Sequence, residues 1–549
     1  MAEIKKMRMD EIKLVIPNPF QFDDRNRSGL KPITLQELKL LSFEAAIRLK
    51  KDWTSKIFDE SIVAKWKTEY NSQQDETIDD SYFDYAIAEC RYQAESSSNE
   101  ILMSPVDGVF QADGIVPQDI LGDLLESVTD LENRPFKDWQ PGSNGQVLDL
   151  VHPSLYSYVY GVSRQLPKQP NNKKLAWNEL FGRGEIQFFQ GDEWDESESK
   201  KFQWLPSEFV IDSVTGAVQI DSYINNLHPE EHESLYATLE KIFSKFVPMF
   251  EILLTRLVNP IELRLELPAG DGYEHKWYVE SRNRRFIDLK PGATRNRRFI
   301  DLKPGAFKPP NLPKNVFSLK GKRLQVIVKL ANIHLTPEKP SYPGGVWHVE
   351  GMRNESIVAS GIYYYDMENI TESRLSFRQK IAESSFRSRY GLEIHRGVKH
   401  FYGLENGMAS NQELGYVCAE PGRLIVFPNI FQHKVEPFEL VDKTRPGHRK
   451  ILVFFLVDPN ISILSTERVP PQQNSWFFKE VCKIVPQIAM LPDLVKKRIQ
   501  ELLPVTLDQA KIFREELIKE RKYYIEDSND TIFERPFSLY ERKRYARHN

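Results

Sequence analysis

The stretch Trp347-His348-Val349-Glu350-Gly351 decides how this chain of 549 residues is interpreted. In a strand, side chains two positions apart point to the same side, so His348 and Glu350 can offer an imidazole and a carboxylate to one ion. Gly351 then allows the chain to leave the strand sharply. The same spacing recurs at His228-x-Glu230, and in a chain this rich in acids such a match arises by chance. The surrounding sequence must therefore show which of the two matches is a metal site.

Short strand patterns joined by turn residues flank this stretch. Apolar and β-branched residues predict strands at 324–335, 357–365, 417–419, 423–427, 433–440 and 449–457. Turns such as Pro428-Asn429 and Pro446-Gly447 separate them. Many short strands with such turns are typical of a jelly roll, also called a double-stranded β-helix. We therefore predict an α+β fold, in which helical regions flank a jelly-roll core.

Helical patterns occupy the two ends of the chain. Thr34-x-x-Glu37 is a capping box, and the helix that it opens has its predicted apolar face at Leu38, Leu41, Ala45 and Leu49. Further helices are predicted near 55–70, 79–95, 228–257, 476–485, 491–503 and 506–524, and a hairpin at 209–220. We expect a mainly helical region at 1–200, a jelly-roll domain with its preceding hairpin and helix at 201–465, and a helical region at 466–549.

A third metal ligand and an anion anchor follow downstream. His433 comes just after the turn Pro428-Asn429, where a strand across the barrel can present it to the first pair. Two histidines and one carboxylate on one side of a metal, with the opposite positions open, form the ligand set of non-haem Fe(II) oxygenases. Arg449 shares strand parity with Ile451 and Val453, so it points inward if they do, and its planar fork suits a carboxylate. We predict His348, Glu350 and His433 as iron ligands and Arg449 as the anchor of a dicarboxylate.

Four residues near these ligands are candidates for a substrate pocket. They are Trp347, Tyr363, Tyr365 and Arg374. By alternation Tyr363 and Tyr365 share one face of their strand, and Tyr364 takes the other. Arg374 and Arg378 are four apart in a predicted helical turn after Thr371, which also suits a surface pair.

Other histidines offer weaker metal sites. His395, His400 and His448 are alternative ligands. His228 and His232 are spaced to share an ion, but the proline and acids of this segment are also explained by the start of a helix.

Composition limits the partners of the chain. The net charge of −4 and the pI of about 6.3 give no electrostatic basis for binding nucleic acid or an anionic membrane. The three cysteines, Cys90, Cys418 and Cys482, are far apart, which fits a reducing compartment. No apolar run reaches the roughly 18 residues of a membrane span, and no signal peptide is evident. We expect a protein of the cytoplasm or nucleus.

One segment is duplicated. The string Arg-Asn-Arg-Arg-Phe-Ile-Asp-Leu-Lys-Pro-Gly-Ala occurs at 282–293 and again at 295–306. Two copies are too few for a solenoid. We interpret them as a local duplication, or an error in the gene model, within a surface loop.

Several longer motifs resemble a known family. They are Trp-His-Val-Glu-Gly-Met from 347, Phe-Pro-Asn-Ile-Phe-Gln-His-Lys-Val-Glu-Pro-Phe from 427, and Pro-Gly-His-Arg-Lys-Ile-Leu-Val-Phe-Phe-Leu-Val-Asp-Pro from 446. These motifs resemble a largely fungal family of uncharacterised proteins, domain of unknown function 4246 (DUF4246), over residues 35–475. That family name implies no activity.

A looser resemblance concerns the metal motif. His348-x-Glu350 with His433 is similar to the ligand motif of the Fe(II)/2-oxoglutarate dioxygenases, and Arg449 to their anchoring basic residue. This resemblance implies Fe(II) and 2-oxoglutarate as cofactors. Most of that superfamily has aspartate at the second ligand position, and Glu350 is one methylene longer.

Together these observations predict an enzyme, an Fe(II)- and 2-oxoglutarate-dependent dioxygenase that oxidises a C–H bond of a small-molecule or peptide substrate. Two alternatives stay open. One is a non-catalytic jelly-roll binding protein with a vestigial metal site, and the other is a cupin-type metal enzyme that uses no keto acid. The sequence identifies neither the substrate, nor the oligomeric state, nor the role of the helical ends.

Overall fold

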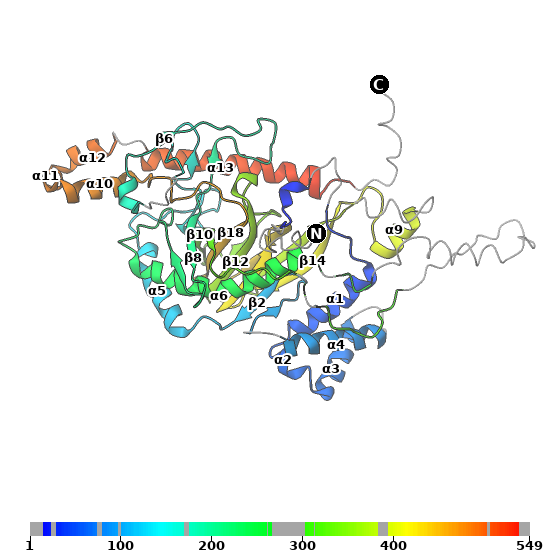
Figure 1. Cartoon of the computed structure of the whole chain (residues 1–549). Coiled ribbons are helices and arrows are strands. Elements are labelled where there is room, and N and C mark those ends of the chain that lie inside the picture. The colour runs from blue at the N-terminus through cyan, green and yellow to red at the C-terminus, as the bar shows by residue number, and fades with distance from the viewer. Residues whose placement is uncertain are drawn as a thin grey trace, which may run out of the picture.

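The computed structural model describes residues 15–22, 29–73, 80–96, 100–168, 175–260, 262–265, 302–311, 313, 315–382, 394–501 and 505–536. The duplicated string lies outside these ranges, except for 302–306. Helices and antiparallel sheets combine in the described part, as predicted (Figure 1). None of the described helices is both long and apolar enough to cross a membrane.

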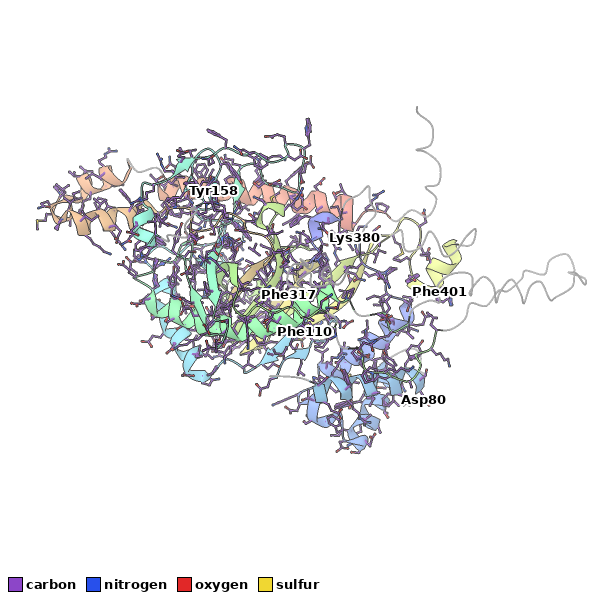
Figure 2. All side chains as sticks on the ribbon, viewed as in Figure 1. Asp80, Phe110, Tyr158, Phe317, Lys380 and Phe401 are labelled. Atoms are coloured by element: carbon purple, nitrogen blue, oxygen red, sulfur yellow. The ribbon has the colours of Figure 1, made fainter. Side chains whose placement is uncertain are left out.

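Four helices near the N-terminus form a lobe beside the main body, where Asp80 marks it in Figure 2. They are α1 (Leu35–Arg48), α2 (Trp53–Lys56), α3 (Glu60–Gln73) and α4 (Asp80–Ser96). Thr34 caps α1 as predicted, because its hydroxyl accepts the N–H of Glu37 at 3.2 Å. The predicted apolar face of α1 is wrong, since the buried face holds Leu40, Phe43 and Ile47. An ion pair between Glu44 and Arg48 allows these charged residues to share that face.

The region before residue 200 contains more strand than predicted. Strands β1 (Leu102–Met103), β2 (Phe110–Asp113) and β3 (Val147–Val151) join the large sheet described below, and helix α5 (Gln118–Glu132) lies between β2 and β3. Strands β4 (Tyr158–Val159), β5 (Arg164–Gln165), β6 (Glu185–Ile186) and β7 (Phe202–Gln203) form two small ribbons. Strands of two to five residues are too short to give a clear alternation. The division at residues 200 and 465 stays a prediction.

The large sheet is antiparallel, in the order β1-β2-β15-β12-β18-β10-β8-β9, and β3 also pairs with β10. Its central members are β10 (Arg323–Leu335), β12 (Ile357–Glu368), β15 (Arg423–Pro428) and β18 (Gly447–Val457), and the predicted hairpin forms β8 (Ser207–Ile211) and β9 (Val218–Ile220). These strands confirm the predicted positions.

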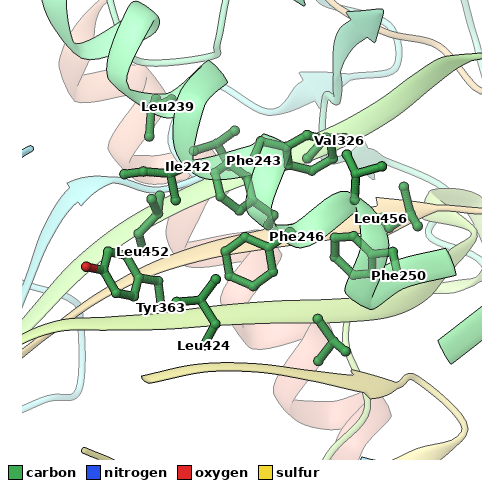
Figure 3. Close-up of a cluster of buried hydrophobic side chains, with 14 of the residues drawn as sticks. Leu239, Ile242, Phe243, Phe246, Phe250, Val326, Tyr363, Leu424, Leu452 and Leu456 are labelled. Carbon is green, nitrogen blue, oxygen red and sulfur yellow. The ribbon is translucent and has the colours of Figure 1, made fainter. Parts of the chain in front are cut away.

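A long helix covers one face of this sheet. Helix α6 (Glu233–Val258) lays Phe243, Phe246 and Phe250 against Leu424 and Leu452 (Figure 3). A Cβ at Gly361 of β12 would lie 2.7 Å from the ring of Phe246. Helix and sheet therefore pack too closely there for a larger residue.

A smaller sheet faces the opposite side of the large one. It consists of β14 (Asn411–Cys418), β13 (Arg374–Lys380) and β16 (Phe431–Val435), with β11 (Ser341–Tyr342) and β17 (Phe438–Glu439) as a separate ribbon. Phe377 of β13 packs in one core with Ile362 and Phe455 of the large sheet. The helical turn predicted around Arg374 and Arg378 is wrong, because alternating burial of Leu375 and Phe377 places this segment in a strand.

Helices return after the sheets, as predicted. They are α10 (Asn474–Ile484), α11 (Pro486–Ala489), α12 (Asp493–Glu501) and α13 (Leu507–Ser528), which is followed by a short π-helix (Asn529–Phe533). Helices α10 to α12 project from one end, and α13 runs across the body (Figure 1). Shorter elements are α9 (Ile394–Tyr402) and the 3-10 turns Pro19–Gln21, Trp177–Leu180 and Arg353–Glu355.

Candidate metal centre

Two segments that are distant in the chain meet at His348 and His433. His433 lies in β16, opposite Phe377 of β13. His348 lies outside the regular strands and makes an isolated antiparallel bridge to His433. The N–H of His348 donates to the carbonyl of His433 at 3.2 Å, and the N–H of His433 donates back at 3.0 Å. The predicted strand at 348–350 is thus reduced to one bridge, but this bridge sets the two histidines side by side.

Three side chains converge at this bridge. Nε2 of His433 lies 3.2 Å from Oε1 of Glu350, and Nε2 of His348 lies 3.9 Å from the same oxygen. The two imidazole centroids are 4.4 Å apart. All three ligand atoms lie within 4.8 Å of one another, which makes these residues a candidate metal group within the described part of the chain. The side chains are 28%, 16% and 5% exposed for His348, Glu350 and His433, so the group is open to solvent on the His348 side.

The protonation states suit a metal. Nδ1 of His348 lies 2.8 Å from the carbonyl of Val346, which accepts its proton and leaves the Nε2 lone pair free. Burial, and then the neighbouring His433, lower the pKa of His348 to about 4. Burial alone would raise the pKa of Glu350, but the hydrogen bond and charge of His433, followed by His348, lower it to about 2. At neutral pH the site therefore offers a neutral imidazole and a carboxylate, as metal ligands require.

Asn429 holds the backbone of Glu350 in place. Its Oδ1 accepts the N–H of Glu350 at 2.7 Å, and its Nδ2 donates to the carbonyls of Glu350 at 3.0 Å and Ile357 at 2.9 Å. Gly351 follows with a φ of +70°, which confirms the sharp exit predicted for it. The sequence marks Asn429 only as a turn residue, because its hydrogen-bond partners are far away in the chain.

We expect Asn429→Ala to lower the free energy of unfolding by roughly 3 kcal/mol, because it leaves buried backbone groups of Glu350 and Ile357 without partners. Urea denaturation measures the change. Asn354→Ala is the matched control, since it removes a single bond to the carbonyl of Phe202 and should cost about 1 kcal/mol. Equal losses in the two variants would contradict the role of Asn429.

Arg449 is a buried cation without an anion. It is 3% exposed, and its Nη1 donates to the hydroxyl of Ser373 at 2.7 Å. Its Nε has no hydrogen-bond partner, and none of the ion pairs among the described residues includes it. Burial lowers its pKa, against an opposing effect of Tyr364. A buried charge normally has a partner, so this guanidinium is suited to an anion from solution.

The orientation of Arg449 follows the predicted parity. Val453 of the same strand packs in the core between the two sheets, and Ile451 packs against that core. The guanidinium carbon lies 5.3 Å from the ring centre of Phe438 and 5.7 Å from that of Tyr364. Ser373 and Tyr364 were not predicted as partners, and only the alternation of β12 placed Tyr364 opposite to its two neighbours.

Two of the four predicted pocket residues point to the outer face of the small sheet. The ring of Trp347 lies between Arg378 and Lys434, 4.7 and 4.8 Å from their charged groups. Arg374 pairs with Glu372 and stacks over Tyr416 at 4.2 Å. Strand alternation turns both away from Phe377 and His433, and their role in a substrate pocket stays a prediction.

The other two predicted pocket residues lie on the helix-covered face of the large sheet. Tyr363 and Tyr365 are buried in the core that α6 covers, and the hydroxyl of Tyr365 donates to Asn332 at 3.1 Å. They share a face as predicted, but it is the face opposite to Arg449. Tyr364 is the tyrosine of this strand that faces the small sheet.

The remaining histidines lie elsewhere. His228 packs between Trp177 and Trp476, with ring centroids 4.8 and 4.9 Å away. His448 lies 2.8 Å from a carboxylate oxygen of Asp366. His400 lies in α9, and the side chain of His395 is outside the described residues. Within the described residues, none of these joins the metal group.

The C-terminal helices also support the site. The side chain of Asn529, just after α13, donates to the carbonyl of Trp347 at 3.1 Å and accepts from Gln432 at 2.8 Å. It therefore ties together the residues that precede His348 and His433. No sequence signal could connect positions about 180 and 100 residues apart.

Geometry and chemistry thus define a candidate metal-binding protein, and comparison with known proteins gives its family. The chain belongs to the family described as protein of unknown function (DUF4246), whose model matches residues 80–480. A second model, for the N-terminal domain of the same family, matches residues 3–69. No match is found among curated proteins.

Several solved structures share fragments with this one. IDO from Bacillus thuringiensis is 10% identical to this chain. The match covers 46% of this chain and 71% of IDO, with a TM-score of 0.22. The Fe(II)/(alpha)ketoglutarate-dependent dioxygenase TqaL is 10% identical to this chain. The match covers 63% of this chain and 93% of TqaL, also with a TM-score of 0.22. A bsmA homolog from Methylobium petroleophilum is 14% identical to this chain. The match covers 25% of this chain and 43% of the homolog, with a TM-score of 0.15. Scores this low carry no argument about fold or activity.

Proposed function

We propose that this protein is an Fe(II)- and 2-oxoglutarate-dependent dioxygenase. The observation that carries the proposal is the pairing of two features between the same two sheets. One is the His348, Glu350 and His433 group, and the other is the buried guanidinium of Arg449, which lacks an anion. The first fits a divalent iron with open positions, and the second fits the far carboxylate of a keto acid.

We also propose that the core is a jelly roll. The chain alternates between the sheets, with β13 and β14 as one consecutive pair: β12, β15 and β18 belong to the large sheet, while β13, β14 and β16 belong to the small one. The order β10-β18-β12-β15 brings together strands that are distant in sequence. This alternation supports two sheets wound from one chain.

The residues present fit the metal. Two imidazole nitrogens and one carboxylate oxygen form a three-ligand face, and Nδ1 of His348 is already tied to Val346. Glu350, one methylene longer than aspartate, reaches the histidines because Asn429 fixes its backbone. The longer side chain therefore does not prevent convergence.

The roles of the residues follow from their positions. Bound iron would supply the chemistry in which O2 oxidises 2-oxoglutarate to succinate and CO2 and places one oxygen atom in a C–H bond of the substrate. Arg449 would bind the far carboxylate of 2-oxoglutarate, and Ser373 would orient the guanidinium through its hydroxyl. The aromatic rings of Tyr364 and Phe438 would exclude water from that ion pair.

The proposal is tested with the purified full-length protein and Fe(II) without oxygen. We expect addition of 2-oxoglutarate to produce a visible charge-transfer band, and glutarate, which has both carboxylates but no keto oxygen, to produce none. Absence of the band at saturating 2-oxoglutarate would contradict the proposal. A metal-binding protein that uses no keto acid would bind iron without the band, so the same experiment separates the cupin-type alternative.

A further inference from the structure

Asp149 is a buried carboxylate without a hydrogen-bond partner. It lies in β3, next to β10, with Ala331 as its neighbour across the strands. Its side chain is enclosed, at 6% exposure, and neither carboxylate oxygen has a donor. The nearby residues Asp138 and Arg514 of α13 pair with each other, since Nη1 of Arg514 donates to both carboxylate oxygens of Asp138 at 2.7 and 2.8 Å. Asp149 therefore lacks what a buried carboxylate normally has, a cation or several donors.

Lys329 is a candidate cation for Asp149, but the two form no ion pair. It lies in β10 two residues from Ala331 and across from Val453 of β18. Since Ile327 and Val453 belong to the core between the sheets, alternation points Lys329 to that side too. It is half-buried, and among the described residues no carboxylate lies within the 4.0 Å of an ion pair with it.

Lys329 acts electrostatically on both Asp149 and the metal group. Burial raises the pKa of Asp149 to about 7, and the charge of Lys329 is the main opposing influence. The same ammonium also acts on His348 and Glu350, in addition to the larger effects of burial and His433. Lys329 is thus within electrostatic reach of Asp149 and of the proposed ligands, and among the described residues neither Lys329 nor Asp149 has an ion-pair partner.

His152 adds a donor beside them. Its Nδ1 accepts the N–H of Ser154 at 3.2 Å, which places the ring proton on Nε2. Burial, followed by the charge of Lys329, holds its pKa well below the usual value, so the ring is neutral. A neutral N–H is suited to a carboxylate or hydroxyl of a ligand.

We propose that Lys329 and Asp149 bind the substrate, and that this substrate is a small zwitterion of the amino-acid type, with its ammonium on Asp149 and its carboxylate on Lys329. The inference rests on the proposed function, because it names the class of molecule to be oxidised beside the metal group.

The opposite charges of Lys329 and Asp149 favour a zwitterion over a simple acid or a simple amine. Opposite unpaired charges that are separated by more than an ion-pair distance are both satisfied by one ligand that carries both signs. A simple acid would leave Asp149 unpaired, and a simple amine would leave Lys329 unpaired. 2-Oxoglutarate, with two carboxylates, would be repelled by Asp149 and has its own anchor at Arg449.

The test is equilibrium dialysis of the full-length protein against the common L-α-amino acids, β-alanine and 4-aminobutyrate. Each zwitterion is compared with the amine and the acid that lack one of its two groups. We expect at least one zwitterion to bind at least about tenfold more tightly than both of its analogues. Equal binding of the zwitterion and either analogue would overturn the proposal.

Variants locate the binding. Lys329→Met should weaken zwitterion binding at least about tenfold, whereas Lys450→Met should not, because Lys450 pairs with Glu132 and Asp366 on the other face. Asp149→Asn should weaken zwitterion binding as Lys329→Met does. If Asp149→Asn fails to fold, Lys329→Met still tests the proposal, because Lys329 is only half-buried. Unchanged binding in Lys329→Met would contradict the proposal.

The failure of this inference can be told apart from failure of the proposed function. The dialysis is run with Fe(II) and 2-oxoglutarate under anaerobic conditions and again with a chelator. Zwitterion binding that persists with the chelator supports Lys329 and Asp149 as the site, whether or not the charge-transfer band forms. A band without selective zwitterion binding would leave the oxygenase proposal standing and overturn this one.

Affinity should also depend on pH. An ammonium binds the ionised form of Asp149, whose pKa lies at about 7 in the folded protein. Zwitterion affinity is therefore expected to rise as the pH increases through about 7 and to level off above it. The groups that face Asp149 are Lys329, Asp138 and Arg514. In Asp149→Asn the rise should disappear, and a rise of the same size in that variant would contradict the contact.

Discussion

His433→Ala is expected to abolish retention of iron and, with it, iron-dependent succinate formation. His433 is the most buried of the three proposed ligands, and its Nε2 lies 3.2 Å from Glu350. Loss of an outer partner of a metal ligand already costs about 10- to 100-fold in affinity, so loss of a ligand should cost more. His348→Ala should behave in the same way. Iron per chain after desalting, and succinate after aerobic turnover, measure the two effects.

The matched control is His448→Ala. His448 is also a histidine near a strand end of this core, but it pairs with Asp366 and not with the metal group. It should keep iron and succinate formation near the level of the unchanged protein. Full turnover in His433→Ala would show that the ligand assignment is wrong, whereas equal losses in both variants would indicate general damage to the fold.

Arg449→Met is expected to weaken binding of 2-oxoglutarate strongly while iron is retained. Removing one partner of a buried charge pair costs about 2–5 kcal/mol, which corresponds to an affinity loss of roughly 30-fold or more. The same change removes a buried guanidinium that has no anion in the ligand-free protein, so the thermal stability of that form should not fall. Titration with 2-oxoglutarate under anaerobic Fe(II) conditions gives the affinity.

Arg449→Lys separates charge from geometry. Lysine keeps the positive charge but offers no planar fork and no fixed bond to Ser373. We expect an affinity between those of the unchanged protein and Arg449→Met. If metal-dependent activity were intact in Arg449→Met, the protein would be a metal enzyme that uses no keto acid.

The sequence predicted the elements of the core because their signals are local. Alternation and turn residues located β10, β12, β15 and β18 to within a few residues. The parity argument placed Arg449 with Val453 on the inner face, and the i, i+2 spacing placed His348 and Glu350 on one side. These predictions depend only on neighbours in the chain.

The directions in which the four predicted pocket residues face could not be predicted from residue type and position alone. Tyr363 and Tyr365 are as apolar as Tyr364, and only the packing of α6 shows which face is which. The segment after Thr371 was predicted as a helical turn, so Arg374 received the wrong partners. A strand that is buried on both faces gives no polar side to mark its orientation.

Residues that act across long distances could not be predicted at all. Asn429 and Asn529 brace the metal group through hydrogen bonds to distant backbone groups. Lys329 and Asp149 come onto neighbouring strands only because β3 lies beside β10. None of these residues stands out in the sequence. Each becomes notable only in the folded chain, either because distant residues contact it or because it lacks a partner.

The most direct test of the three proposed iron ligands is a crystal structure of the protein grown anaerobically with Fe(II), in which anomalous scattering at the iron edge locates the metal. We expect a single iron within coordination distance of Nε2 of His348, a carboxylate oxygen of Glu350 and Nε2 of His433. Iron bound elsewhere, or an imidazole of His433 turned away from the metal, would contradict it.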